Sequence, residues 1–289
     1  MTRRSAVLAL WTTCLIWGAA FPLGKLALLD ATPMAFTAAR FVIATLLLAP
    51  WLGQPTRAEW RAGGILGALL ALGFATQTVG LGITTASRSG FLTALYIPFT
   101  PLIVFAVYRL RPGRLATGGL ALGLIGLVLL TRPAALAGGF NRGDLLTVGC
   151  AVCFAAHMVA TGTLTRRHPP VRLLITQIAT ATLFTLAFLP AIETPVIRPT
   201  PTLIAIIGYE AILASVVALR LQLAAQQVLS PTSTALIYTL EPVIAAVASY
   251  LITGDRLSPL QWGGGVLILT GSLLPELGTM LRHESAAER

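Results

Sequence analysis

A carboxylate and a proline stand side by side in an apolar stretch of this sequence. Glu241 and Pro242 lie in the middle of residues 234–255, which are long enough to cross a bilayer. A charge at that depth costs about 3 kcal/mol or more unless it has a partner or a water-filled cavity. Proline lacks a backbone N–H, so Pro242 is expected to leave the carbonyl of Tyr238 without its helical partner. A kinked helix with one ion pair and a helix lining a substrate cavity both fit this pattern.

The same pattern occurs earlier in the chain. The Thr-Ala-Leu triplet at 93–95 matches the triplet at 234–236, and Pro101 matches Pro242, both at an offset of 141. Proline is the commonest cause of a sharp bend in a helix. We therefore predict hinges at Pro98, Pro101 and Pro242.

Further polar and aromatic side chains in the apolar stretches could contact a bound molecule. Trp17 and Phe21 are four residues apart and share one helix face, where they could form an apolar wall or simply pack. The guanidinium of Arg40 needs a carboxylate partner, either Glu241 or a substrate. Glu210 is a second acidic candidate, whose helix rotation the sequence leaves open. The predicted substrate-binding residues are Trp17, Phe21, Arg40, Gln77, Tyr96, Phe154, His157, Tyr238 and Glu241.

Motifs for catalysis or for cofactor binding are missing from the sequence. It contains no HExxH, no GxSxG and no P-loop. Cys14, Cys150 and Cys153 lie in apolar runs, and the CxxC spacing of the last two has no second pair or nearby acid to complete a zinc or redox site. We therefore expect no enzyme activity, no metal and no cofactor, with an intramembrane enzyme as the alternative from another functional class.

The composition predicts an integral membrane protein. Of the 289 residues 56% are hydrophobic and 10% are charged, whereas soluble domains carry about 25% charged residues. The mean hydropathy is +0.83. The formal net charge of +10 comes from short basic clusters between apolar runs, not from the continuous basic stripe of a nucleic-acid-binding protein.

Apolar runs of the length that spans a bilayer divide the chain into ten predicted transmembrane helices. They cover residues 5–29, 33–52, 63–85, 89–108, 115–131, 144–165, 171–190, 202–219, 232–252 and 257–275. The predicted fold is thus all-α, with short connections and no separate soluble domain.

The distribution of basic residues predicts the orientation in the membrane. With the N-terminus inside, the inner ends of the helices collect thirteen arginines, at positions 3, 4, 57, 61, 109, 111, 114, 166, 167, 172, 220, 282 and 289. The outer ends collect five, at positions 88, 132, 142, 198 and 256. Cytoplasmic loops are enriched in Lys and Arg, so we expect both termini in the cytoplasm.

An internal repeat relates the first five predicted helices to the last five. Arg40 matches Gln177 at an offset of 137. At an offset of 145, three glycines, Gly118, Gly119 and Gly126, match Gly263, Gly264 and Gly271. Five is an odd number, so the second copy enters the membrane from the opposite side. Inverted repeats are typical of secondary transporters, which bind substrate near the midplane between the halves. The predicted repeats are residues 1–135 and 140–281.

The order of these motifs resembles the EamA family of the drug/metabolite transporter superfamily, including its YddG-type amino-acid exporters. The features that carry the resemblance are Trp17-Gly18 with Lys25, Pro33 with Arg40-Phe41, Glu241-Pro242 with Gly254-Asp255, and the glycine-rich span 263–271. The chain departs from the family pattern at Asp255, where Glu is usual, and at Phe154-Ala155, where Trp-Ala is common.

The resemblance implies a secondary transporter that exports small metabolites, with amino acids as the first expectation, across the inner membrane by alternating access. A drug or nucleoside-type exporter is the alternative within the superfamily. The expected partners are the lipid bilayer and a small-molecule substrate, with no nucleic acid, and we expect a monomer.

Overall fold

The computed structural model describes residues 1–83, 86–131, 139–253 and 258–287. Gly254 and Asp255, which carry part of the family resemblance, lie outside these ranges. The first half of the chain forms α1 (Arg3–Ala27), α2 (Pro33–Leu48), η1 (Ala49–Trp51), α3 (Arg57–Ile83), α4 (Ala86–Thr93), α5 (Tyr96–Tyr108) and α6 (Arg114–Thr131). The second half forms α7 (Arg142–Leu164), α8 (Pro170–Ile192), α9 (Pro201–Tyr209), η3 (Glu210–Val217), α10 (Ala218–Ala225), α11 (Pro231–Ile237), η4 (Tyr238–Leu240), α12 (Glu241–Thr253) and α13 (Pro259–Ala287).

The described residues form an all-helical membrane protein. Eight of their helical segments are long and apolar enough to cross a bilayer, and Arg114–Leu130 is a shorter apolar helix. Several of these segments combine consecutive elements, so that α9, η3 and α10 make one continuous span, Pro201–Ala225. The eighth predicted span, 202–219, was therefore about six residues too short. Extended backbone pairs in the described chain only at an isolated bridge between Ala31 and Ile197.

Local sequence signals explain where the helices begin. Proline occupies the first position of several of them, where its missing N–H would have no helical acceptor in any case. Asn141 forms a capping box with Asp144 at the start of α7, each side chain accepting from the other residue's backbone N–H at 2.9 Å. The first-position prolines are Pro33, Pro170, Pro201, Pro231 and Pro259.

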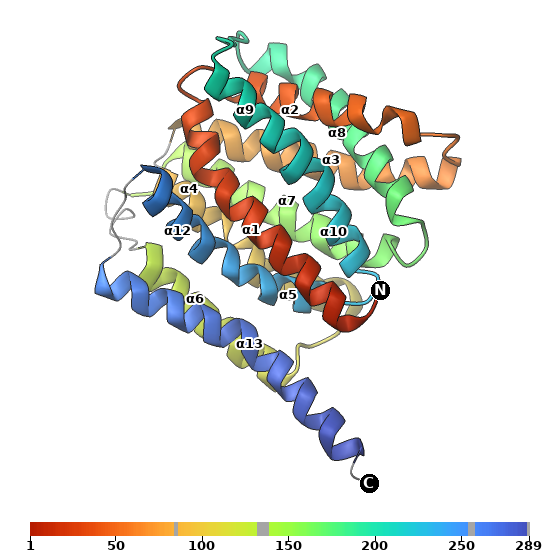
Figure 1. Ribbon diagram of the computed structural model, residues 1–289, viewed down its shortest axis with the longest axis vertical. Helices are drawn as coiled ribbons and strands as arrows, with labels where there is room; N and C mark the ends of the chain where they lie inside the picture. The colour runs from red at the N-terminus through yellow and green to blue at the C-terminus, as the bar shows by residue number, and fades with distance from the viewer. Residues whose placement is uncertain (84–85, 132–138, 254–257, 288–289) are drawn as a thin grey trace.

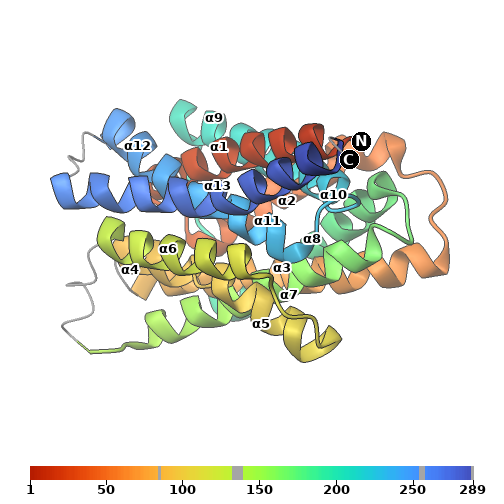
Figure 2. The same ribbon diagram turned by 90° about the horizontal axis from the view of Figure 1, so that it is seen from below.

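The helices pack as a bundle with one pair along its edge. α6 and α13 lie side by side at that edge (Figure 1), at a distance that only glycine permits. A Cβ on Gly119 would collide with the carbonyl oxygen of Gly271, and one on Gly126 with that of Gly264. Elsewhere α3 packs on α7 and α8, and α1 packs on α10 and α12. Figures 1 and 2 both place the start of α1 and the end of α13 at the same end of the bundle.

Two of the spans are interrupted near the predicted hinges. Between α4 and α5 the N–H of Ile97 donates to the carbonyl of Ala94 at 3.0 Å. The 3₁₀ turn η4 separates α11 from α12, and the N–H of Glu241 donates to the carbonyl of Tyr238. The predicted loss of a partner for the carbonyl of Tyr238 was wrong, because a tighter i→i+3 bond satisfies it. The carbonyl of Ala94 is satisfied in the same way.

The prolines that were predicted to act as hinges lie just after these interruptions. Pro98 and Pro101 are in the first two turns of α5, and Pro242 is the second residue of α12. Proline is well tolerated near a helix start. Each interruption is thus built from a tight turn followed by proline.

Candidate functional site

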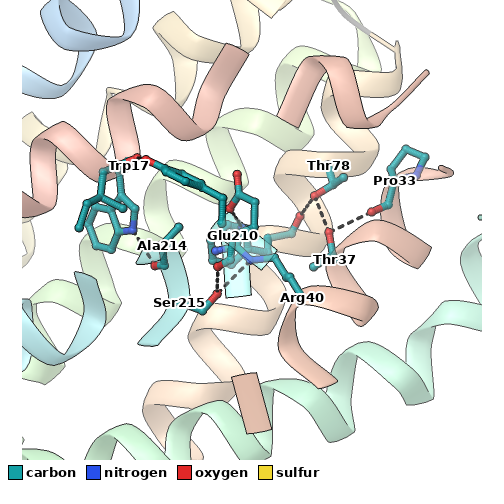
Figure 3. A network of polar contacts seen from close by, with 11 residues as sticks. Trp17, Pro33, Thr37, Arg40, Thr78, Glu210, Ala214 and Ser215 are labelled. Atoms are coloured by element: carbon teal, nitrogen blue, oxygen red, sulfur yellow. Dashed lines mark hydrogen bonds and ion pairs between the residues drawn. The ribbon is translucent and has the colours of Figure 1, made fainter. Parts of the chain in front are cut away.

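A buried ion pair joins α2 to the span α9–η3–α10. Nη1 of Arg40 lies 2.9 Å from Oε2 of Glu210, and the side chains are 8% and 3% exposed. Nε of Arg40 donates to Oγ of Ser215 at 3.1 Å (Figure 3). The guanidinium carbon lies 4.5 Å from the ring centroid of Phe74 and 5.3 Å from that of Phe41. The buried cation is therefore paired, hydrogen-bonded and covered by aromatic rings.

A stretch of π-helix places both partners of Arg40. η3 is a π-helix over Glu210–Val217, and within it the hydroxyl of Ser215 donates to the carbonyl of Glu210 at 2.8 Å. In an α-helix residues five apart point about 140° away from each other. The wider π turn brings Glu210 and Ser215 to the same side, facing Arg40.

Glu241 does not pair with Arg40, which corrects one prediction made from the sequence. Its Oε2 instead accepts a hydrogen bond from the hydroxyl of Tyr96 at 2.8 Å. Tyr96 and Glu241 are 6% and 8% exposed. Within the described residues no cation forms an ion pair with Glu241, since the Arg40 guanidinium is bound to Glu210. A carboxylate that is buried with one neutral hydrogen-bond donor lacks a positive charge to balance its own.

Trp17 connects the two acidic centres. Its Nε1 donates to the carbonyl of Ala214 at 2.9 Å, next to Ser215 (Figure 3). Its ring meets Tyr238 edge to face, with centroids 5.4 Å apart and planes at 69°. Tyr238 is fully buried and precedes Glu241 by one turn. The indole thus reaches from the ion pair on one side to the Glu241 helix on the other.

The remaining predicted site residues fall into smaller contacts. Phe154 meets Phe74 edge to face at 5.2 Å, so it belongs to the aromatic surroundings of Arg40. His157 Nε2 and Gln177 Oε1 are 3.0 Å apart in a buried pair. Gln77 donates to Thr93 at 3.3 Å. Phe21 is half-buried on α1, with no polar or ring contact to the acidic centres in the described part of the chain.

Three site residues were missed or left undecided by sequence reasoning. Glu210 and Ser215 are polar residues inside an apolar span. The direction in which their side chains point depends on η3, and a π-helix has no reliable sequence signature. Phe74 looked like any other apolar core residue. Groups of acidic, histidine and cysteine side chains able to hold a metal ion are absent among the described residues.

Comparison with known proteins identifies relatives over the whole length. The model of the EamA-like transporter family matches residues 4–132 and again 141–275. An uncharacterized transporter of Archaeoglobus fulgidus is 32% identical over 275 residues, covering 95% of this chain and 87% of the relative. The uncharacterized inner membrane transporter YedA of Escherichia coli K12 is 23% identical over 279 residues, covering 94% and 91%. A crystal structure with 20% sequence identity superposes with a TM-score of 0.78, over 96% of this chain and 98% of the other, which supports the fold alone.

Proposed function

Because this chain belongs to the EamA-like transporter family, we propose that it is a secondary transporter that exports small amine-bearing metabolites, amino acids first, by alternating access. The inner membrane is the proposed location, in line with the description of its relative YedA. Relatives that are described as transporters argue for movement of a substrate rather than for its chemical conversion.

The observation that carries the proposal is the unpaired state of Glu241. Its carboxylate is buried with the Tyr96 hydroxyl as its hydrogen-bond donor, and no described cation neutralises it. A protonated amine would supply the missing positive charge and further hydrogen-bond donors. The other charged centre is already neutral, because Arg40 is bound to Glu210. The charge of the site that has no counter-ion is therefore negative, and this favours a substrate with a cationic group.

An amino acid also needs a place for its own carboxylate. Two of the five N–H donors of Arg40 contact Ser215 and Glu210, which leaves donors for a substrate carboxylate. Trp17, between the two acidic centres, would face the substrate side chain. In this proposal the amine binds Glu241 and Tyr96, and the carboxylate binds on the Arg40 side.

The mechanism we propose is movement of two inverted five-helix repeats, residues 1–135 and 140–281, about the prolines Pro98, Pro101 and Pro242. The contacts of the bundle support it, since they come in pairs that the repeat relates. α1 packs on α12 as α5 packs on α7, and α2 packs on η3 as α8 packs on α3. The charged side chains are 2–8% exposed, so this conformation is closed around the site.

The orientation is part of the proposal, with both termini cytoplasmic. Phe140 and Gln54 are exposed and lie in connections at opposite ends of the bundle in this scheme. A cysteine at Gln54 should react with a membrane-impermeant thiol reagent from the cytoplasmic side, and a cysteine at Phe140 from the outside. Labelling of both from the outside would contradict the orientation.

A second candidate function is export of organic cations such as drugs. The same observation favours it, because the neutralised Arg40 gives no net positive charge to attract a carboxylate. Counterflow in proteoliposomes with amino acids, nucleosides and cationic dyes separates the candidates. Amino-acid counterflow supports the first proposal, and dye counterflow without amino acids supports the second. Chemical conversion of a substrate without its movement would overturn both in favour of an intramembrane enzyme.

A further inference from the structure

An apolar groove lies between α5 and α6, away from the acidic centres. Its volume is 560 Å³, within the range of about 300–1,000 Å³ typical of small-molecule sites. Pro98, Pro101, Leu102 and Phe105 line it on the α5 side. Leu102 is 61% exposed and Phe105 36%, so this wall faces outward. The remaining lining residues are Arg111, Pro112, Thr117, Leu120, Ala121 and Leu124.

The shape of the groove suits a single hydrocarbon chain. From Pro98 to Phe105 the wall is about 10 Å long, given the rise of about 1.5 Å per helical residue. Pro98 and Pro101 are three residues apart and share one face of α5. On the opposite wall Ala121 is small and exposed, which leaves the groove open along α6.

One end of the groove carries a positive charge that the backbone geometry holds in place. α5 ends at Tyr108, and the next residue, Arg109, has a left-handed φ of 57° and donates its N–H to the carbonyl of Phe105. The chain turns here into the connection between α5 and α6. In that connection the guanidinium carbon of Arg111 lies 5.5 Å from the Phe105 ring centroid. Arg111 is exposed, and no described residue forms an ion pair with it.

The surrounding sequence makes this end strongly basic. Arg109, Arg111 and Arg114 fall within six residues, and no acidic residue occurs between Glu59 and Asp144. Clusters of basic residues at the end of a membrane helix attract anionic lipid headgroups. An anionic amphiphile fits this groove, because its apolar chain would contact the apolar walls and its anionic headgroup would contact the basic end.

We propose that this groove binds one acyl chain of an anionic phospholipid, with its phosphate on Arg111. The groove shares Pro98 and Pro101 with the proposed hinges but none of the side chains proposed to bind the transported substrate. The proposal therefore does not depend on the identity of that substrate. A zwitterionic lipid such as phosphatidylcholine fits the apolar part equally, but its own positive charge weakens the attraction to the arginines.

Native mass spectrometry of the purified full chain tests the proposal. Phosphatidylglycerol and phosphatidylcholine with identical acyl chains are offered in equal amounts. We expect preferential retention of one phosphatidylglycerol. Arg111→Gln should lower that retention on the order of fivefold, the effect of one basic residue near a membrane surface. Arg111→Lys should keep most of it, and Ala121→Phe, which fills the groove, should lower retention of both lipids.

Arg57→Gln is the matched control, because it removes an exposed arginine at the start of α3. It should leave lipid retention unchanged. Equal retention of both lipids by the natural chain would overturn the proposal and indicate ordinary annular lipid. Equal losses in Arg57→Gln and Arg111→Gln would overturn it as well, as a general effect of surface charge. Melting curves check the fold of each variant, and the two Arg111 variants decide the outcome if Ala121→Phe is unstable.

Discussion

Glu210 and Glu241 are both buried near the middle of apolar spans, and their surroundings differ. Glu210 lies 2.9 Å from Arg40, which also binds Ser215 and is covered by aromatic rings. Glu241 accepts one hydrogen bond, from Tyr96, and pairs with no described cation. A buried pair is complete without a ligand, whereas a lone carboxylate is stabilised by any cation that reaches it. In the function that we propose, Glu210 therefore has a structural role and Glu241 binds the substrate.

The backbone around Glu210 is continuous, whereas the backbone around Glu241 is interrupted. Glu210 begins a π-helix that follows α9 directly and continues directly into α10. Glu241 follows the 3₁₀ turn η4 and precedes Pro242, and the equivalent span in the first half is interrupted before Pro98. Glu210 of the ion pair thus lies in a continuous helical span, whereas Glu241 lies at an interruption of its span, where we propose a hinge.

Arg40→Gln tests the structural side of the comparison and should have the largest effect on stability. It leaves Glu210 buried without its partner, so we expect the free energy of unfolding to fall by about 3–5 kcal/mol. Thermal denaturation in detergent measures the loss. Adding Glu210→Gln should restore a large part of it, because the uncompensated charge is then removed. A double variant with the summed losses of both single variants would contradict the pairing.

Tyr96→Phe tests the binding side. It removes the hydroxyl that positions the Glu241 carboxylate, and a hydrogen bond to a charged group contributes about 1.5–3 kcal/mol. We expect transport of an amine-bearing substrate to fall about tenfold in counterflow assays. Tyr209→Phe is the matched control, since its hydroxyl donates to the Ile16 carbonyl at 2.8 Å on the other side of the site. An equal loss of transport in both variants would mean that the hydrogen bond from Tyr96 to Glu241 has no special role in binding.

Pro101→Ala and Pro242→Ala test whether the breaks act as hinges. Alanine restores the backbone donor and straightens the helix, so we expect slower turnover with little change in substrate affinity. Pro190→Ala, near the end of α8 and exposed, is the control. Unchanged turnover in both hinge variants, measured alongside binding, would count against the hinge mechanism.

Trp17→Phe should have the smallest effect. The ring contact with Tyr238 is largely kept, while the hydrogen bond from Nε1 to the Ala214 carbonyl is lost. We expect a loss of about 1 kcal/mol in the free energy of unfolding. A loss as large as that of Arg40→Gln would mean that the indole, rather than the ion pair, holds the two regions together.

Much of the architecture could be predicted from the sequence, because the bilayer imposes simple rules. Long apolar runs act locally, and they predicted membrane-spanning helices. The repeated glycines indicated an internal repeat, but the close packing of α6 on α13 that they permit was not predicted. That Glu241 needs a polar partner also followed from one local fact, a charge at membrane depth, and its carboxylate accepts a hydrogen bond from Tyr96.

The pairing of Arg40 could not be predicted, because it depends on the direction in which the acidic side chains point around their helix axes. The sequence indicates only how deep in the membrane they lie. Arg40 needed an acid, and both Glu210 and Glu241 lie in apolar spans. The choice between them is made by the π-helix, which turns Glu210 and Ser215 together toward α2. Similarly, the carbonyl of Tyr238 accepts a hydrogen bond within a 3₁₀ turn, whereas the prediction assumed the i→i+4 bonds of an ideal α-helix.

Glu241→Gln, measured in counterflow and in thermal denaturation, tests the central claim most directly. The change keeps the shape of the side chain and removes its charge. We predict a loss of at least about tenfold in transport of an amine-bearing substrate, since a charged hydrogen bond contributes about 1.5–3 kcal/mol. The melting temperature should change by no more than about 2–4 °C, the equivalent of about 1 kcal/mol for a chain of this size. Normal transport together with a normal melting temperature would contradict the binding role of Glu241.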